Sequence, residues 1–262
     1  MFIGFNLNLK RNDPQSFFNV SDIEIEEYEK EMADLKETMQ SKINQKISLS
    51  DIETNTLNGS KLIKEWFPNY EADVFISHSH KDVKIAKRLA CWLKREFDLR
   101  AFIDSTVWGN NADLLKSIDN KYAKSGDHTY DYNIRNFTTS HVHMMLSTAL
   151  NDMIYSTECL IFLNTPESLS VTEVKNEQTN SPWIYNELKI ASTIRRVYPR
   201  GEGKFSTNTY QQRNSLVINY DMDDILLKLE DLNGNKLQEW QKESQNSFNH
   251  PLDVLYSLVA KN

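Results

Sequence analysis

DVFIS at residues 73–77 and RAFID at residues 100–104 are short apolar runs, and each ends in a polar residue. Such runs are typical of buried strands. Between them, residues 82–96 carry apolar side chains at the spacing of one helix face. Because parallel strands need a crossover connection, which is usually a helix, the three segments predict a strand–helix–strand unit.

The same alternation continues towards the C-terminus. CLIFL at residues 159–163 predicts a third strand and LVINY at residues 216–220 a fourth, with helices expected at about 140–155 and 182–196. Alternating strands and helices predict an α/β fold, with a parallel sheet flanked by helices on both faces. Residues 222–262 are expected to form helices, broken at Asn233-Gly234 and near Pro251.

The first 70 residues are predicted to form an N-terminal strand and a helical extension. Residues 1–10 alternate apolar and polar side chains as a strand does, and their charges are not ordered as in a signal peptide. Ser21 is the expected N-cap of a long helix. The apolar stripe of this helix consists of Ile25, Tyr28, Met32, Leu35, Met39 and Ile43. We expect the stripe to be buried, either on the chain's own domain or against a second copy.

The composition is that of a globular protein. Of the 262 residues, 39% are hydrophobic and 26% are charged, and 30 basic against 37 acidic residues give a net charge of −7. This balance argues against nucleic acid or an anionic membrane as a partner of the whole chain. Cys91 and Cys159 lie in apolar runs, as buried thiols do, and no apolar run is long enough to span a bilayer. We therefore expect a protein of the reducing cytoplasm.

Ligands of an open parallel sheet bind beyond the carboxyl ends of its strands. The residues that follow each predicted strand are therefore the candidates for a site. Four clusters meet this condition: Ser77-His78-Ser79-His80, Asp104 with Ser105 and Trp108, Asn164 with Thr165, and the helix start that carries Trp183 and Glu187.

Lys81 opens the helix after the first predicted strand. Free backbone N–H groups at this helix start, together with the lysine charge, suit a phosphate group. Ser79 is also a good N-cap for the helix, whatever the helix start binds. His78 and His80 have no cysteine and no trio of carboxylates nearby that would complete a ligand set, so we expect no metal site.

Asp104 and Trp108 each allow two interpretations. Asp104 either accepts hydrogen bonds from sugar hydroxyls or caps the turn that follows its strand. Trp108 either stacks on a base or anchors the polar stretch of residues 105–138 by packing. We expect this stretch to fold over the crevice, because it collects four further aromatic side chains.

Glu187 is the most informative single residue of the sequence. SPWIYNEL at residues 181–188 puts Glu187 four residues after Trp183, on the same face and in the first turns of a helix. Most helix glutamates are solvated surface groups, and we expect a partly exposed position here as well. A functional role for Glu187 therefore depends on its neighbours at the crevice.

Three of these segments, in this order, resemble the TIR domain family. ADVFISH at residues 72–78 resembles the first conserved box of TIR domains, and FID at residues 102–104 resembles their second strand. Ser181-x-Trp183-x-x-x-Glu187-Leu188 resembles the motif that carries the catalytic glutamate of TIR enzymes. The likeness is greatest to prokaryotic TIR proteins of antiphage defence, including Thoeris-like systems.

The resemblance implies a fold and a domain organisation. It implies a flavodoxin-like TIR domain at residues 71–221, with residues 105–138 as an insertion. Residues 1–70 would then be the N-terminal strand and helical extension, and residues 222–262 would be C-terminal helices packed on the TIR domain.

The resemblance also implies an activity. TIR enzymes of this kind cleave the nicotinamide–ribose bond of NAD and yield ADP-ribose or a cyclic ADP-ribose isomer as an immune signal. It implies that Glu187 is catalytic and that NAD is the substrate and not a cofactor. The expected substrate-binding residues are Ser77, His78, Lys81, Asp104, Ser105, Trp108 and Trp183. Expected partners are other TIR subunits and a downstream effector that reads the nucleotide product.

Two further functions stay open. The loop after Asp104 lacks the Arg-Asp-x-x-Pro-Gly pattern of animal receptors, and residues 110–138 form a longer stretch than is typical of the family. One alternative is a non-catalytic TIR scaffold that assembles with other TIR domains. The other is an enzyme similar to nucleoside deoxyribosyltransferases, which share the fold type and also use a glutamate.

Overall fold

The computed structural model describes residues 2–8, 18–49, 57–108, 111–127, 129–171, 177–194 and 219–260. Contacts divide the chain into two compact units that interleave along the sequence. Unit 1 consists of Met1–Phe17, Ser77–Asp82 and Glu158–Asn262, and unit 2 consists of Phe18–Ile76 and Val83–Thr157. The predicted domain boundaries near residues 70 and 221 stay a prediction.

The larger sheet has five strands in the order β3-β2-β4-β1-β8. The strands are β1 (Ile3–Asn8), β2 (Val74–Ser77), β3 (Ala101–Phe102), β4 (Cys159–Asn164) and β8 (Glu230–Leu232). Strand β1 is parallel to β4 and to β8, and β2 is parallel to β3. The α/β class and the predicted strands at residues 73–77, 100–104 and 159–163 are confirmed.

Strand β1 lies inside the sheet, between β4 and β8. Its register with β4 runs from Ile3 opposite Cys159 to Asn8 opposite Asn164. The expectation that residues after 222 form only helices is wrong, because β8 pairs with Phe5 to Leu7 of β1. The Glu-Asp-Leu sequence of β8 has one apolar residue, so it carries no strand pattern of its own.

A second sheet, in unit 1, is antiparallel and has the order β5-β6-β7. Its strands are β5 (Ser170–Val171), β6 (Glu177–Thr179) and β7 (Tyr220–Asp221). The fourth strand predicted for the parallel sheet, at residues 216–220, is corrected here, because Tyr220 pairs with Thr179 in the antiparallel sheet. Residues 216–218 lie outside the described residues.

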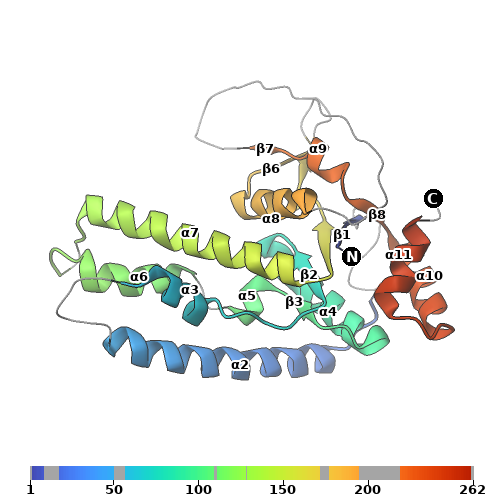
Figure 1. The fold of residues 1–262 in the computed structure, drawn as a ribbon, viewed down its shortest axis with the longest axis horizontal. Helices are drawn as coiled ribbons and strands as arrows, with labels where there is room; N and C mark the ends of the chain where they lie inside the picture. Colours follow the sequence, from blue (N-terminus) through green and yellow to red (C-terminus); the bar gives the residue numbers. More distant parts are fainter. Residues whose placement is uncertain are drawn as a thin grey trace. The chain divides into compact units, whose positions relative to one another are not determined.

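The described helices of unit 1 are η1 (His80–Asp82), α8 (Pro182–Thr193), α9 (Asp223–Leu226), α10 (Gly234–Gln245) and α11 (Pro251–Ala260). The predicted break at Asn233 is confirmed, because its side chain caps α10 by accepting from the N–H of Lys236. The predicted break near Pro251 is also confirmed, since α11 begins there. Helices α10 and α11 pack on each other, and Nε1 of the buried Trp240 donates to the Pro251 carbonyl at 2.7 Å (Figure 1).

The described helices of unit 2 are α2 (Asp22–Leu49), α3 (Gly59–Trp66), α4 (Val83–Phe97), α5 (Asp104–Val107), α6 (Asn111–Tyr122) and α7 (Tyr132–Ser156). Figure 1 shows α6 and α7 side by side, as their contacts require. Residues 105–138 form most of α5, all of α6 and the first turns of α7, and the expectation that this stretch folds over the crevice stays a prediction. Helix α7 begins early because the Asp131 side chain accepts from the N–H of Ile134.

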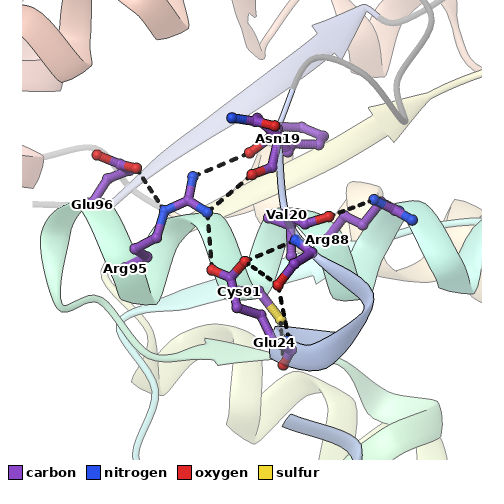
Figure 2. Close-up of polar contacts among 9 residues, drawn as sticks. Asn19, Val20, Glu24, Arg88, Cys91, Arg95 and Glu96 are labelled. Carbon is purple, nitrogen blue, oxygen red and sulfur yellow. Dashed lines mark hydrogen bonds and ion pairs between the residues drawn. The ribbon is translucent and has the colours of Figure 1, made fainter. Parts of the chain in front are cut away.

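Helix α2 begins at the predicted cap. The Glu24 N–H donates to Ser21 Oγ, and Glu24 Oε2 accepts from the Ser21 N–H at 2.8 Å, which is a capping box. Figure 2 shows how this start is held on α4. Arg95 donates to Glu24 at 2.9 Å and to the Asn19 carbonyl at 3.1 Å, and Arg88 donates to the Val20 carbonyl at 2.8 Å.

The apolar stripe of α2 faces its own unit where it is described. The helix packs on α3, α4 and α5, and the Met32 side chain is buried. The hydroxyl of the half-buried Tyr28 lies 3.4 Å from Thr106 Oγ1. The side chains of Leu35 and Met39 lie outside the described residues. The described part of the stripe therefore agrees with packing on the chain's own domain.

The two cysteines are buried and free, as their apolar surroundings predict. Burial raises the pKa of the Cys91 thiol to about 11, so this thiol stays protonated near neutral pH. None of the helices in the described ranges has both the length and the apolar character needed to cross a membrane.

Trp108 is an internal anchor of unit 2. The residue is 2% exposed, and its Nε1 donates to the Pro68 carbonyl at 3.0 Å. The indole makes edge contacts with the rings of Phe67 and Phe102, at centroid distances of 5.3 and 4.8 Å. Of the two interpretations of Trp108, packing agrees with the structure, because a ring this buried offers no face on which a base could stack.

Replacing Trp108 tests its anchoring role. Trp108→Ala leaves a cavity and removes the donor to Pro68, so we expect a loss of about 3–5 kcal/mol in the free energy of unfolding. Trp108→Phe keeps most of the ring contacts and should cost less. Tyr132→Ala, at an exposed position of α7, is the control and should stay within about 0.5 kcal/mol of the wild type. Urea unfolding measures all three, and a wild-type midpoint for Trp108→Ala would contradict the anchor.

Candidate functional site

Ser77 and Glu187 meet inside unit 1. Ser77 is the last residue of β2, and its Oγ donates to Glu187 Oε2 on α8 at 2.7 Å. Both side chains are buried, with 1% and 5% of their surface exposed. A residue from the first predicted cluster and one from the fourth are thus in direct contact.

The expectation that Glu187 is partly exposed is wrong. Glu187 shares one face of α8 with Ile184, Leu188 and Ala191, which are all buried and follow helical spacing. Helix α8 packs on β1, β6 and α9, so the glutamate is carried into the interior with its apolar neighbours.

The start of α8 fixes the position of Glu187 along the helix. Ser181 caps the helix, since its Oγ accepts from the Ile184 N–H at 3.3 Å, and Pro182 occupies the first turn, where its missing N–H costs nothing. Trp183 is half-buried one turn before Glu187. The carboxylate therefore lies in the second turn of α8.

A buried carboxylate is costly unless hydrogen bonds replace its lost hydration. With the carboxylate ionised, a hydrogen bond such as the one from Ser77 contributes about 1.5–3 kcal/mol. It also fixes the orientation of the carboxylate. Chemically, the pair can present a fixed negative charge in a low-dielectric setting, where the charge acts strongly on any nearby positive charge.

Thr165, directly after β4, belongs to a closed network with Asp82. Thr165 Oγ1 donates to Asp82 Oδ2 and accepts from the N–H groups of Glu167 and Ser168, both at 3.2 Å. Ser168 Oγ donates to the Leu163 carbonyl at 2.9 Å. These bonds tie the turn after β4 to the segment after β2, and they explain Thr165 as a structural residue.

Asp82 is buried, and burial raises the pKa of its carboxyl group. The hydrogen bond from Thr165 acts in the opposite direction, as do the nearby charges of His78 and Lys81. Sequence reasoning did not single out Asp82. The sequence places Asp82 at the start of a helix, but aspartate is common at helix starts, so this position alone does not mark a functional residue.

Asn6 of β1 and Asn164 of β4 form a second buried pair. Asn164 Nδ2 donates to Asn6 Oδ1 at 3.0 Å, while Asn164 Oδ1 has no hydrogen-bond partner among the described residues. Asn164 was expected among the candidates, and Asn6 was missed. The feature that could have marked Asn6 as a candidate is its place as a polar residue inside the buried run IGFNLN.

Asn6 also lines an open pocket of about 420 Å³ beside β8 and α9. The rest of the lining consists of three carboxylates, from Glu177, Asp223 and Asp231, and three leucines. Carboxylates repel phosphate groups, so the pocket does not suit a dinucleotide. Among the described residues, no group of three or more His, Cys, Asp or Glu side chains could hold a metal ion.

His78 and Lys81 follow Ser77 along the chain. Lys81 is exposed, and its Nζ forms an ion pair with Glu167 at 2.6 Å, which raises the pKa of the lysine. The predicted capping by Ser79 is observed as an acceptor contact of 3.4 Å to the Lys81 N–H. His78 is half-buried directly after Ser77. A phosphate-binding role of Lys81 stays a prediction.

Asp104 and Ser105 lie at the start of α5 in unit 2. Asp104 Oδ1 accepts from the adjacent Ser105 N–H at 2.7 Å. Asp104 is the first residue of α5, and Ile103 in the capping position makes no side-chain cap bond, so the capping interpretation of Asp104 stays a prediction. Its predicted role towards a ribose stays a prediction.

Comparisons with known proteins assign no family to the chain. No protein-family model matches it, and no curated protein or solved structure shows significant similarity. The resemblance to TIR domains therefore rests on the three motifs at residues 72–78, 102–104 and 181–188.

The raised pKa of Asp82 predicts how this residue makes the free energy of unfolding depend on pH. Between the unfolded and the folded pKa, the folded chain binds more protons than the unfolded chain, so the aspartate lowers stability as pH rises through this window. Asp82→Asn removes the effect. As pH rises above the ordinary pKa of an aspartate, we expect the variant to gain stability relative to the wild type.

Asp98→Asn is the control, because Asp98 is expected to affect the pH dependence of stability in the opposite direction from Asp82. Lys94 holds the pKa of the exposed Asp98 below its usual value, so the stability from this pair is present at neutral pH and is lost as pH falls. Urea unfolding at a series of pH values measures both variants. Equal pH slopes for Asp82→Asn and the wild type would show that Asp82 is not held as described.

Proposed function

We propose that the chain is a TIR-type enzyme that cleaves the nicotinamide–ribose bond of NAD, with Glu187 as its catalytic carboxylate. The observation that carries this proposal is the hydrogen bond of 2.7 Å between Ser77 and Glu187. It joins the first and the third of the motifs that resemble TIR domains, and these motifs lie 110 residues apart in the sequence. Two motifs that meet at one carboxylate support a shared chemical task.

The chemistry of NAD cleavage fits one carboxylate. Nicotinamide in NAD is already a cationic leaving group, so breaking its bond to ribose needs no general acid, unlike ordinary glycoside hydrolysis. The electron pair of that bond leaves with nicotinamide, which becomes neutral, and positive charge grows on the ribose. Glu187 would accept hydrogen bonds from the ribose hydroxyls and stabilise this charge in the transition state.

Ser77 would act as a positioning residue. Its hydroxyl donates to one carboxylate oxygen of Glu187 and so fixes the plane of the carboxylate before substrate arrives. A preorganised anion needs little reorganisation at the moment of reaction, which is the main source of electrostatic catalysis.

Burial of Glu187 supports an enzyme with a low basal rate. With 5% of its surface exposed, the residue can meet a ribose only after the side chains that cover it move. The same cover excludes water, which bears on the fate of the sugar cation. Attack by water yields ADP-ribose, whereas attack by another atom of the same molecule yields a cyclic isomer. Under this proposal the product is a cytoplasmic immune signal in antiviral defence, read by a downstream effector.

The experiment is nicotinamide release from NAD by the wild type and by Glu187→Gln at equal protein concentrations. Gln keeps the shape and an acceptor for Ser77 but removes the charge that faces the cation, so we expect a loss on the order of a hundredfold or more. Glu239→Gln, an exposed position on α10, is the matched control and should keep the wild-type rate. Equal rates for Glu187→Gln and the wild type would remove Glu187 from the mechanism.

Stability gives a second readout for the same variant. Because Gln relieves the burial of a charge and keeps the hydrogen bond, we expect the melting temperature of Glu187→Gln to equal or exceed that of the wild type. Glu187→Ala leaves Ser77 without this acceptor and should lower the stability by about 1–3 kcal/mol. A wild type that releases no nicotinamide even at high protein concentration would favour the alternative of a non-catalytic TIR scaffold.

A further inference from the structure

Helix α7 exposes large apolar side chains along one face. Phe137, Met144 and Tyr155 are 65%, 66% and 78% exposed. With the residues between them they form the α7 stripe, which consists of Phe137, His141, Met144, Thr148, Asn151 and Tyr155. The opposite face of α7 is used inside unit 2, where Val142, Met145, Ala149 and Met153 are buried and the helix packs on α3 and α6.

The α7 stripe follows the spacing of a helix-pairing seam. Phe137, Met144 and Asn151 are seven residues apart, and His141, Thr148 and Tyr155 repeat the same interval. Two interleaved seven-residue rows keep one face of a helix turned towards a partner helix. The stripe spans about 27 Å at 1.5 Å per residue. The rings of Phe137 and His141 are in contact at a centroid distance of 4.3 Å, which gives the stripe an ordered end.

The charge of α7 is unusually low for a helix with an exposed face. Its 25 residues contain two fixed charges, Arg135 and Asp152, in a chain of which 26% is charged. Neither belongs to the α7 stripe, and Arg135 forms an ion pair with Asp119. Two copies of a protein with a net charge of −7 repel each other least where they meet through an uncharged face.

We propose that two copies of this chain pair through their α7 stripes, antiparallel and about a two-fold axis near residue 146. The six positions of the stripe are spaced symmetrically about this point, with an aromatic residue at each end. In such a pair Phe137 faces Tyr155 of the other copy, and His141 faces Asn151. The remaining pair, Met144 with Thr148, lies next to the axis. Every contact is then made twice, as a two-fold interface requires.

The area of the α7 stripe suits such a pair. Phe137, Met144 and Tyr155 together expose roughly 400 Å² on one copy, at the ~200 Å² that a large side chain offers. Two copies bury about twice this area. The flanking Ile134, His141 and Asn151 bring the total to the ~1,000 Å² that separates specific interfaces from chance contacts.

Other occupants fit the stripe less well. A membrane-surface helix needs a row of lysines or arginines beside its apolar face, and α7 has Arg135 alone. Nucleic acid needs the same charges. The pairing concerns unit 2 and does not depend on NAD chemistry, so its failure would leave the proposal for Glu187 intact.

Sedimentation velocity of the full chain over a wide range of concentration tests the pair. We expect the wild type to dimerise, and Met144→Glu to raise the dissociation constant by at least about a hundredfold, since the charge enters the interface twice. Asn136→Glu, on the same helix but off the stripe, should dimerise as the wild type does. Both positions are exposed, and melting temperatures should show that both variants fold. A monomer at all concentrations, or unchanged dimerisation of Met144→Glu, would overturn the proposal.

Disulfide trapping tests the antiparallel register. In a Phe137→Cys/Tyr155→Cys double variant, the two sites of one chain lie about 27 Å apart along the helix, too far for an intrachain disulfide. Oxidation should therefore yield covalent dimers. Asn136→Cys/Tyr155→Cys turns one thiol away from the stripe and should stay largely uncrosslinked. Equal crosslinking of the two variants would refute the register.

Discussion

The rest of the structure depends on the burial of both faces of β1 and β4. All six residues of β4 and five of the six in β1 are buried. A parallel pair of this kind must be covered on both sides, because neither face is polar enough to meet water. The requirement draws two distant segments together, since β1 comes from the first residues of the chain and β8 from residues 230–232.

The same burial creates the setting of the candidate site. Helix α8 covers part of this sheet with Ile184, Leu188 and Ala191, and Glu187 lies on the same face. At such a position a leucine would be the stable choice, because it would add buried apolar area and avoid the desolvation of a charge. The bond from Ser77 offsets part of the cost and does not remove its cause. Under the proposed function, a carboxylate at this position is explained by chemistry and not by stability.

The sequence carried the information for the elements with strong local signals. The apolar runs of β2, β3 and β4, the capping box at Ser21 and the break at Asn233 all follow from local patterns. Strand β8 had no such pattern, since only its pairing with β1 makes it a strand. The contact of Ser77 with Glu187 agrees with the rule that site residues gather at the carboxyl ends of parallel strands. The burial of Glu187 could not be predicted in this way, because it depends on which face of α8 packs against the sheet.

Two features depart from the usual arrangement of apolar residues inside and charges outside. Glu187 brings a charge into the interior of unit 1, and the α7 stripe leaves apolar side chains in water on unit 2. Both lie on well-packed helices, so neither results from poor packing nearby. Under the two proposals, each feature serves an interaction with something outside the chain. For a buried anion that is a positive charge to stabilise, and for an exposed apolar face it is a surface to cover it.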